Sequence, residues 1–236
     1  MDSSAKPSYL ALLGDLAGSR DLTDRAAVQE RLQVAVQALN RLHGFEMAAE
    51  LTIGGGDQVS ALFLPEKGSL APPAACAATE LVLGLGLRLA PTRLCFGLGH
   101  GALSVPLAPG TPIGALDGPC FHLAHEALLE AKRRDLFLTA RGLGPKDPLL
   151  TGVFALLGTQ LESWTPRQVD YAREILGGQM FEDEGGLADT LAQKEVAARF
   201  GVGPSVVSET LKAIRLERFR RGAWAAALAF LGSDID

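Results

Sequence analysis

The sequence predicts an α+β protein, in which a module of strands and helices is followed by a module of helices alone. Over residues 8–142, short apolar runs that end near glycine alternate with apolar residues at helical spacing. A stretch containing glycine and proline interrupts this pattern at residues 141–148, and only helical spacing follows it. We therefore expect two domains, at residues 8–142 and 149–222.

The first module is expected to have a ferredoxin-like core. Short apolar runs bounded by turn residues predict strands at residues 9–13, 92–103 and 136–140, and a pair of strands around a tight turn within residues 51–64. Helical spacing predicts helices at residues 25–43, 72–89 and 118–134. The first six elements follow the order β-α-β-β-α-β, which defines the ferredoxin-like core, and a helix and a strand extend it.

The second module is expected to contain a helix-turn-helix. Helical spacing predicts helices at residues 149–163, 165–176, 189–200 and 205–219. In "KEVAARFGVGPSVVSETLKA", Ala197 provides a small residue where two helices cross, and Gly201 tolerates the positive φ that the turn requires. Ser205 is placed to cap the second helix.

Positive charge is concentrated around this motif. The chain has a net charge of −5, to which residues 1–189 contribute −7, residues 190–222 contribute +4 and residues 223–236 contribute −2. A basic end on an acidic body is typical of a module that faces nucleic acid. We predict DNA contacts from Ser205, Ser208, Glu209, Lys212, Arg215 and Arg218. The alternative is a helical hairpin that serves only packing or dimerisation.

Composition argues against several other classes of protein. A hydrophobic content of 47% is sufficient for a folded core. No apolar run approaches the roughly 20 residues of a membrane span. The three cysteines include no CxxC pair, which favours neither a disulfide framework nor a zinc ribbon. Because the N-terminus shows no secretory pattern, we expect a cytoplasmic protein that does not contact membranes.

Two aspartates form the candidate binding site of the first module. Asp15 follows the first predicted strand and Asp57 lies in the turn of the strand pair, so the predicted core brings them side by side. Two carboxylates in this arrangement can hold Mg²⁺ against the phosphates of a nucleotide. The neighbouring residues expected to contact such a ligand are Gly18, Ser19, Arg20, Gly55 and Gly56. The alternative is that both aspartates only cap their turns.

Short motifs throughout the chain resemble a known family. "GDLAGS", "GGGDQVSALF", "GLGHGAL" and "GPCFHLAHEALLEAK" resemble, in this order, the palm domain of class III nucleotidyl cyclases. More closely, "YLALLGDLAGSRDLTDR", "GGGDQVSALF", "GPCFHLAHEAL", "SWTPRQ" and "AQKEVAARFGVGPSVVSETLKA" together resemble the SatD family over about residues 8–220. This resemblance implies a nucleotidyl cyclase-like palm domain followed by an all-α helix-turn-helix domain, in a protein that resembles a regulator.

The resemblance also shows where the chain departs from the cyclases. Asp15 and Asp57 match the two metal-binding aspartates of that family, but Ile53 stands where the cyclases have a Lys that reads the base. His122 and Glu126 stand where they have an Asn and an Arg, and a carboxylate there would repel a transferring phosphoryl group. We therefore predict a DNA-binding transcriptional regulator whose palm domain is catalytically inactive, senses a nucleotide or metal, and pairs two chains as a homodimer.

Two other functions stay open at this point. One is a Mg²⁺-dependent nucleotidyl or phosphoryl transferase that uses Asp15 and Asp57. The other is an interaction protein whose helices at residues 149–219 only dimerise.

Overall fold

A five-stranded sheet forms the centre of the molecule. The computed structural model describes residues 7–18, 24–66, 69–70, 72–108, 110–176, 180–181 and 186–231. The strands are β1 (Ser8–Leu16), β2 (Met47–Gly54), β3 (Gln58–Phe63), β6 (Leu94–Ala102) and β7 (Leu138–Arg141), in the order β2-β3-β1-β6-β7. A separate pair consists of β4 (Pro65–Glu66) and β5 (Ser69–Leu70). All neighbours in the main sheet are antiparallel except β6 and β7, which are parallel.

Helices account for most of the remaining described chain. They are α1 (Arg25–His43), α2 (Pro72–Leu89), α3 (Pro119–Arg134), α4 (Lys146–Glu162), α5 (Pro166–Leu176), α6 (Gly186–Phe200), α7 (Pro204–Ala213) and α8 (Leu216–Phe230), with short 3₁₀ turns η1 (Gly44–Glu46) and η2 (Ile113–Ala115). Apart from the short β4–β5 pair and η1, the element order from β1 to β6 is the predicted β-α-β-β-α-β. The α+β fold class predicted from the sequence is therefore confirmed.

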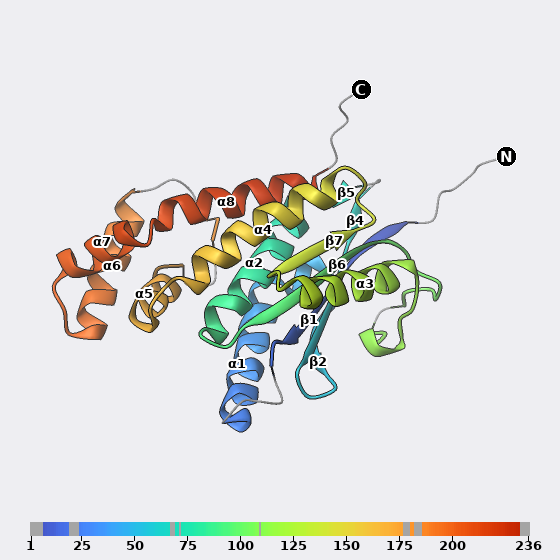
Figure 1. The fold of residues 1–236 in the computed structure, drawn as a ribbon, viewed down its shortest axis with the longest axis horizontal. Helices are drawn as coiled ribbons and strands as arrows, with labels where there is room; N and C mark the ends of the chain where they lie inside the picture. The colour runs from blue at the N-terminus through green and yellow to red at the C-terminus, as the bar shows by residue number, and fades with distance from the viewer. Residues whose placement is uncertain are drawn as a thin grey trace.

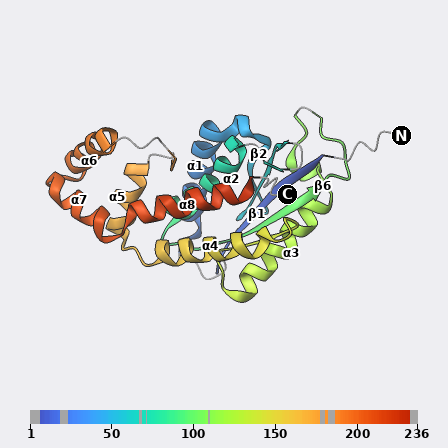
Figure 2. The same ribbon diagram turned by 90° about the horizontal axis from the view of Figure 1, so that it is seen from above.

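The sheet is covered by helices on both faces. Figure 2 shows α3 on one side of the strands and α1 and α2 on the other. Successive residues of β1 contribute to these two layers in turn, as the pleat of a strand requires. Leu10 and Leu12 are buried in the cluster that contains α1 and α2, whereas Ala11 is buried with residues of α3. Asp15 lies four residues after Ala11 and therefore points to the same side of the sheet, toward α3.

Glycines in β6 allow α3 to pack directly against the sheet. A Cβ atom added at Gly97 would collide with the backbone oxygen of Ala124, and one at Gly99 would collide with that of Cys120. Both positions face α3, so the helix and the strand meet at backbone distance. The glycine-rich sequence of β6 is thus a packing requirement.

The part of the chain from β1 to β7 is called the sheet module, and the C-terminal helices α4 to α8 extend it to one side. In Figure 1, α5, α6 and α7 form an arm at the left, and α8 returns from this arm along α4 and α2. The α4–α8 pair is antiparallel, because the Lys146 amine donates to the Leu231 carbonyl oxygen at one end and Gln160 donates to the Ile214 carbonyl oxygen at the other. One buried apolar cluster includes Leu12 of β1 and Phe230 of α8.

A buried ion pair connects the segment before α6 to this core. His43 Nε2 lies 2.7 Å from Glu80 Oε2, and the other oxygen of Glu80 accepts hydrogen bonds from the backbone N–H groups of Met180 (2.5 Å) and Phe181 (3.3 Å). Since a buried carboxylate is stable only when it is paired and hydrogen-bonded, these contacts hold Met180 and Phe181 against α2. The sequence analysis did not identify this pair.

Candidate functional sites

Asp15 and Asp57 come from adjacent strands at the same end of the sheet. Asp15 lies near the end of β1 and is in register with Gln58, the first residue of β3. Asp57 directly precedes Gln58 in the turn between β2 and β3. The topology therefore places the two aspartates where the sequence analysis expected them.

Each of these carboxylates has a basic partner from a different helix. Lys132 of α3 donates to Asp15 Oδ2, and Arg25 of α1 places Nη2 3.7 Å from Asp57 Oδ2. Both aspartates are mostly buried, with side-chain exposures of 17% for Asp15 and 16% for Asp57. Lys132 was missed by the sequence analysis, because 117 positions separate it from Asp15 and no local pattern joins them.

Three of the predicted ligand-binding residues have backbone conformations that favour glycine. The φ angles are +64° at Gly18, +58° at Gly55 and +94° at Gly56. The Gly56 carbonyl oxygen also accepts a hydrogen bond of 3.0 Å from the Gln29 side chain. These glycines therefore shape the turns beside the aspartates. Ser19 and Arg20 lie outside the described residues.

The donor set at this site is only partly suited to a metal ion. Carboxylate oxygens are the ligands that Mg²⁺ prefers, but both carboxylates are already paired with cations. Among the residues described, no group of three or more His, Cys, Asp and Glu side chains gathers in a way that could hold a metal ion. In the arrangement seen, Mg²⁺ would have to displace Lys132 from Asp15, so the residues as placed do not fit a metal centre.

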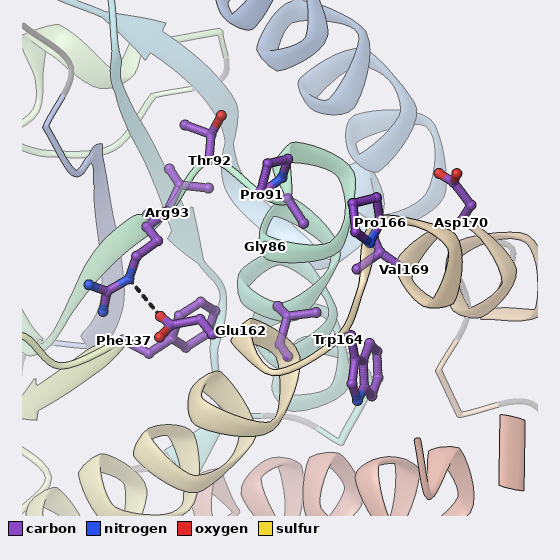
Figure 3. A pocket seen from close by; sticks show the side chains of 13 residues that line it. Gly86, Pro91, Thr92, Arg93, Phe137, Glu162, Trp164, Pro166, Val169 and Asp170 are labelled. Atoms are coloured by element: carbon purple, nitrogen blue, oxygen red, sulfur yellow. Dashed lines mark hydrogen bonds and ion pairs between the residues drawn. The ribbon is translucent and has the colours of Figure 1, made fainter. Parts of the chain in front are cut away.

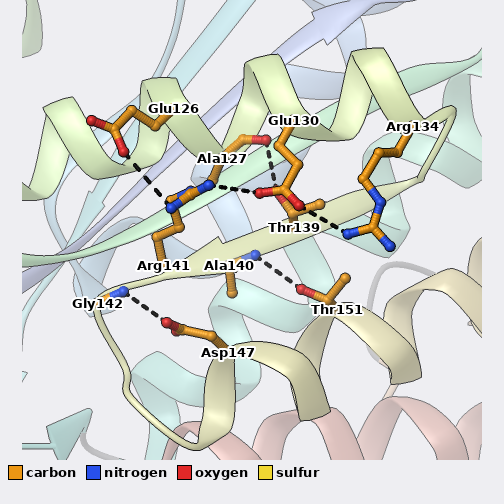
Figure 4. A network of polar contacts seen from close by, with 10 residues as sticks. All are labelled: Glu126, Ala127, Glu130, Arg134, Thr139, Ala140, Arg141, Gly142, Asp147 and Thr151. Carbon is orange, nitrogen blue, oxygen red and sulfur yellow. Dashed lines mark hydrogen bonds and ion pairs between the residues drawn. The ribbon is translucent and has the colours of Figure 1, made fainter.

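Glu126 belongs to a different surface of α3. Its carboxylate faces Arg141 of β7, with the Nη1–Oε2 distance at 3.9 Å, and Arg141 also pairs with Glu130 at 2.8 Å (Figure 4). His122 Nε2 lies 2.9 Å from Asp117 Oδ1. Neither Glu126 nor His122 therefore contacts Asp15, and Lys132 is the α3 residue that does.

The helix-turn-helix predicted from Ala197 and Gly201 is present in α6 and α7. Gly201 has a φ of +64°, and the Val202 N–H donates to the Ala197 carbonyl oxygen at 3.0 Å, which closes the turn. Ala197 is 2% exposed where the helices meet, and Val207 and Leu211 are buried on the inner side of α7. The small residue at the crossing, the positive φ in the turn and the buried apolar side chains of α7 are thus all present as expected.

Helix α5 completes a three-helix unit with α6 and α7. The rings of Tyr171 and Phe200 lie edge to face with centroids 5.0 Å apart, and the Arg167 guanidinium stacks near both rings. Arg199 of α6 forms an ion pair with Glu174 of α5 at 2.5 Å. The sequence analysis predicted α5 as a helix but assigned it no part in the motif.

Both ends of α7 differ from the prediction. The helix begins with Gly203 as N-cap and Pro204 as first residue, and no side chain caps it, so Ser205 is not the cap. The expected continuous helix over residues 205–219 is also wrong. The helix ends at Ala213, and Arg215 adopts a left-handed conformation with φ of +54° as the N-cap of α8. Arg215 and Arg218 therefore lie at a bend.

The predicted DNA-contacting residues lie on an accessible face. Ser205, Glu209, Lys212, Arg215 and Arg218 are exposed, and Ser208 is half-buried. Within the described part of the chain, none of Lys212, Arg215 and Arg218 takes part in an ion pair.

Comparisons with known proteins find one protein family and, with low similarity, solved structures. The SatD family profile matches residues 9–228. A bacterial light-regulated adenylyl cyclase matches with a TM-score of 0.42 and 16% identity, covering 57% of this chain and 75% of its own. The guanylyl cyclase Cya2 matches with a TM-score of 0.38 and 18% identity, covering 52% of this chain and 70% of its own. No curated protein matches the sequence significantly.

The described helices include none that is long and apolar enough to cross a membrane. The match over residues 9–228 spans both the sheet module and the helix-turn-helix, as the motifs from "YLALLGDLAGSRDLTDR" to "AQKEVAARFGVGPSVVSETLKA" predict. The chain belongs to the SatD family.

Proposed function

We propose that this chain is a DNA-binding regulator that presents α7 to the major groove of duplex DNA. The observation that carries the proposal is the geometry of α6, the turn at Gly201 and α7. One face of α7 is buried through Val207 and Leu211, and the opposite face is exposed. In helix-turn-helix proteins, the second helix lies in the major groove with its N-terminal residues against base edges.

The exposed face of α7 has the chemistry that groove readout requires. Ser205, Glu209 and Lys212 are spaced four and three residues apart, so they lie along one side of the helix. Serine pairs with several base edges, and a glutamate accepts from the amine of cytosine. The N-terminus of α7 has no side-chain cap. Because Pro204 has no N–H and the Val206 N–H donates to the Gly203 carbonyl oxygen, the Ser205 N–H is the group that this end offers to a phosphate.

Lys212, Arg215 and Arg218, which form no ion pair with a described residue, supply the affinity of the proposed complex. Lys212 ends the exposed face of α7, and Arg215 and Arg218 lie at the bend that follows. Contacts from such groups to phosphates release counterions, so binding weakens as salt concentration rises. This local charge offsets the net charge of −5 of the whole chain.

The sheet module is assigned the role of sensor and dimerisation unit in this proposal. Helix-turn-helix proteins commonly bind two half-sites as symmetric dimers. The turns at Gly18, Gly55 and Gly56 are the proposed contacts for a nucleotide. The metal binding predicted for Asp15 and Asp57 is not part of this proposal, because both carboxylates are paired with cations. We assign no reaction to this site, because Lys132 and Arg25 already neutralise both carboxylates.

The experiment is a salt titration of DNA binding by fluorescence anisotropy. The full chain is titrated against a labelled duplex of mixed sequence between about 50 and 200 mM salt. We expect the slope of log K against log salt concentration to become less steep by about 2 in the double variant Lys212→Ala and Arg215→Ala. The affinity is expected to fall at every salt concentration.

The matched control removes two exposed cations from the sheet module, by Arg41→Ala and Arg133→Ala. This variant should bind DNA as the unmodified chain does, because these residues lie on α1 and α3. Equal loss of affinity in both double variants would show non-specific attraction to charge. No binding at 50 mM salt would reject the proposed function.

A further inference from the structure

A cavity lies where the sheet module meets the C-terminal helices. Its volume is about 340 Å³, and it opens between the end of α2, the start of β6 and the connection from α4 to α5 (Figure 3). Its walls are largely apolar, formed by Pro91, Phe137, Leu161, Trp164, Pro166 and Val169. This size and lining resemble sites for small molecules, which are mostly apolar clefts with few polar groups.

The polar side of the cavity carries one fixed cation and a carboxylate with a free oxygen. Arg93 Nε donates to Glu162 Oε1 at 2.7 Å, and Arg93 Nη1 donates to Asp135 at 2.7 Å. Within the described part of the chain, Glu162 Oε2 accepts no hydrogen bond, and the side chain is 38% exposed. An amine bound in the cavity would therefore find an unused acceptor.

The charge around the cavity disfavours an anionic ligand. The lining residue Asp170 pairs with Arg173 at 2.6 Å, and Arg93 is shared between Glu162 and Asp135. The residues that line the cavity thus include two acids, Glu162 and Asp170, and one base, Arg93, so their charges sum to a negative value. A cation beside Glu162 would correct this imbalance, and a carboxylate would increase it.

We propose that this cavity binds a small aromatic amine. The aromatic ring would lie among Phe137, Trp164 and Val169, and the ammonium group would reach Glu162. Aromatic walls add to the attraction for a cation. A compound of about nine non-hydrogen atoms is expected to bind with a Kd of roughly 0.1–10 mM.

The position of the cavity makes its occupant a contact between modules. Phe137 and Arg93 belong to the sheet module, and Trp164 and Val169 belong to the helices. Trp164 also contacts Phe219 of α8, with ring centroids 5.0 Å apart. The binding proposal does not depend on DNA binding, and it is tested without DNA.

The probe is 2-phenylethylamine, compared with 2-phenylethanol and phenylacetate, which share its ring but are neutral and anionic. Trp164 lines the cavity, and the other tryptophan, Trp224, contacts Phe181 elsewhere. In a Trp224→Phe background, the emission of Trp164 alone reports binding. We expect a saturable change, with affinity decreasing from the amine to the alcohol to phenylacetate.

The blocking variant is Thr92→Phe, which adds a ring at the rim of the cavity. Its control is Thr159→Phe on the exposed side of α4, where the hydroxyl donates only to its own helix. Thr92→Phe should lower the affinity for 2-phenylethylamine by at least tenfold, and Thr159→Phe should leave this affinity unchanged.

Backbone amide NMR of the unmodified chain tests the location independently of any variant. The amine should shift signals within residues 86–94 and 161–170 and leave those of α7 unchanged. The proposal is wrong if the amine causes no saturable change, if the shifts lie elsewhere, or if phenylacetate binds as tightly as the amine.

Discussion

The end of the sheet that carries Asp15 and Asp57 and the helix-turn-helix differ in how their charged side chains are paired. Asp15 and Asp57 are mostly buried, and each has a cation from another helix. Lys212 and Arg218 are exposed, and neither pairs with an acid among the described residues. A carboxylate already neutralised inside the chain contributes first to the fold, whereas an unpaired surface cation is available to a partner.

The largest effect expected from this comparison is on DNA affinity. Reversing two cations in the variant Lys212→Glu and Arg218→Glu should weaken DNA binding by about 100-fold, because two phosphate contacts become repulsions. The free energy of unfolding should change by less than about 0.5 kcal/mol, since both are surface substitutions. Anisotropy and urea unfolding measure the two quantities. A large loss of stability would show that these cations serve the fold.

A smaller effect is expected from the turn of the motif. Gly201→Ala should lower the free energy of unfolding by about 1 kcal/mol, because alanine is strained at a φ of +64°. No atom lies within 4 Å of the added Cβ, so the loss reports strain alone. Gly203→Ala is the matched control, since Gly203 has a φ of −73°. Equal losses in the two variants would contradict this explanation.

Removal of the internal cation should alter both stability and metal response. Lys132→Met leaves Asp15 without its partner and is expected to cost about 1 kcal/mol of unfolding free energy. Mg²⁺ should then raise the melting temperature of this variant more than that of the unmodified chain, because Asp15 is released. Arg133→Met, one residue along α3, is the control for calorimetry. An identical Mg²⁺ response in all three proteins would mean that Lys132 does not compete with a metal.

The smallest effect concerns the α3 surface that includes Glu126. Hydrogen bonds from Arg134 and then Arg141 hold the pKa of the Glu130 carboxyl below its ordinary value. A lowered pKa in the folded state stabilises the protein above the unfolded pKa, and this stabilisation is lost as pH falls through the folded pKa. Glu130→Gln should cost less than about 1 kcal/mol at pH 7. The difference should begin to shrink as pH falls below the unfolded pKa of about 4.3, and it should vanish below the lower folded pKa. Urea unfolding at several pH values measures it, and a difference that persists in acid would contradict this cause.

Local patterns predicted much of the fold. The helices at residues 25–43 and 72–89 have the predicted bounds, because helical spacing and the capping Asp24 or Pro72 are visible in sequence. The turn at Gly201 was also predictable, since few residues other than glycine adopt a positive φ without strain.

Contacts between distant segments were not predictable. No sequence pattern joins Lys132 to Asp15, so the cation that occupies the Asp15 carboxylate was missed. The break at Arg215 was missed for a different reason: arginine adopts the left-handed conformation there because α7 and α8 pack on different partners, not because of its own preference. The DNA-contacting role of the exposed cations stays a prediction.

Helix α8 is a stiff connection between the helix-turn-helix and the sheet. Its 15 residues make a rod of about 22 Å. Its far end is packed in the same core as the sheet, and its near end meets α7. Tilting such a rod by about 10° at the sheet would move α7 by about 4 Å, a geometric estimate from the rise per residue. In the proposed DNA-binding dimer, small repacking at the sheet would thus be amplified into a change in the distance between the two α7 helices, and the preferred spacing of half-sites would change with it.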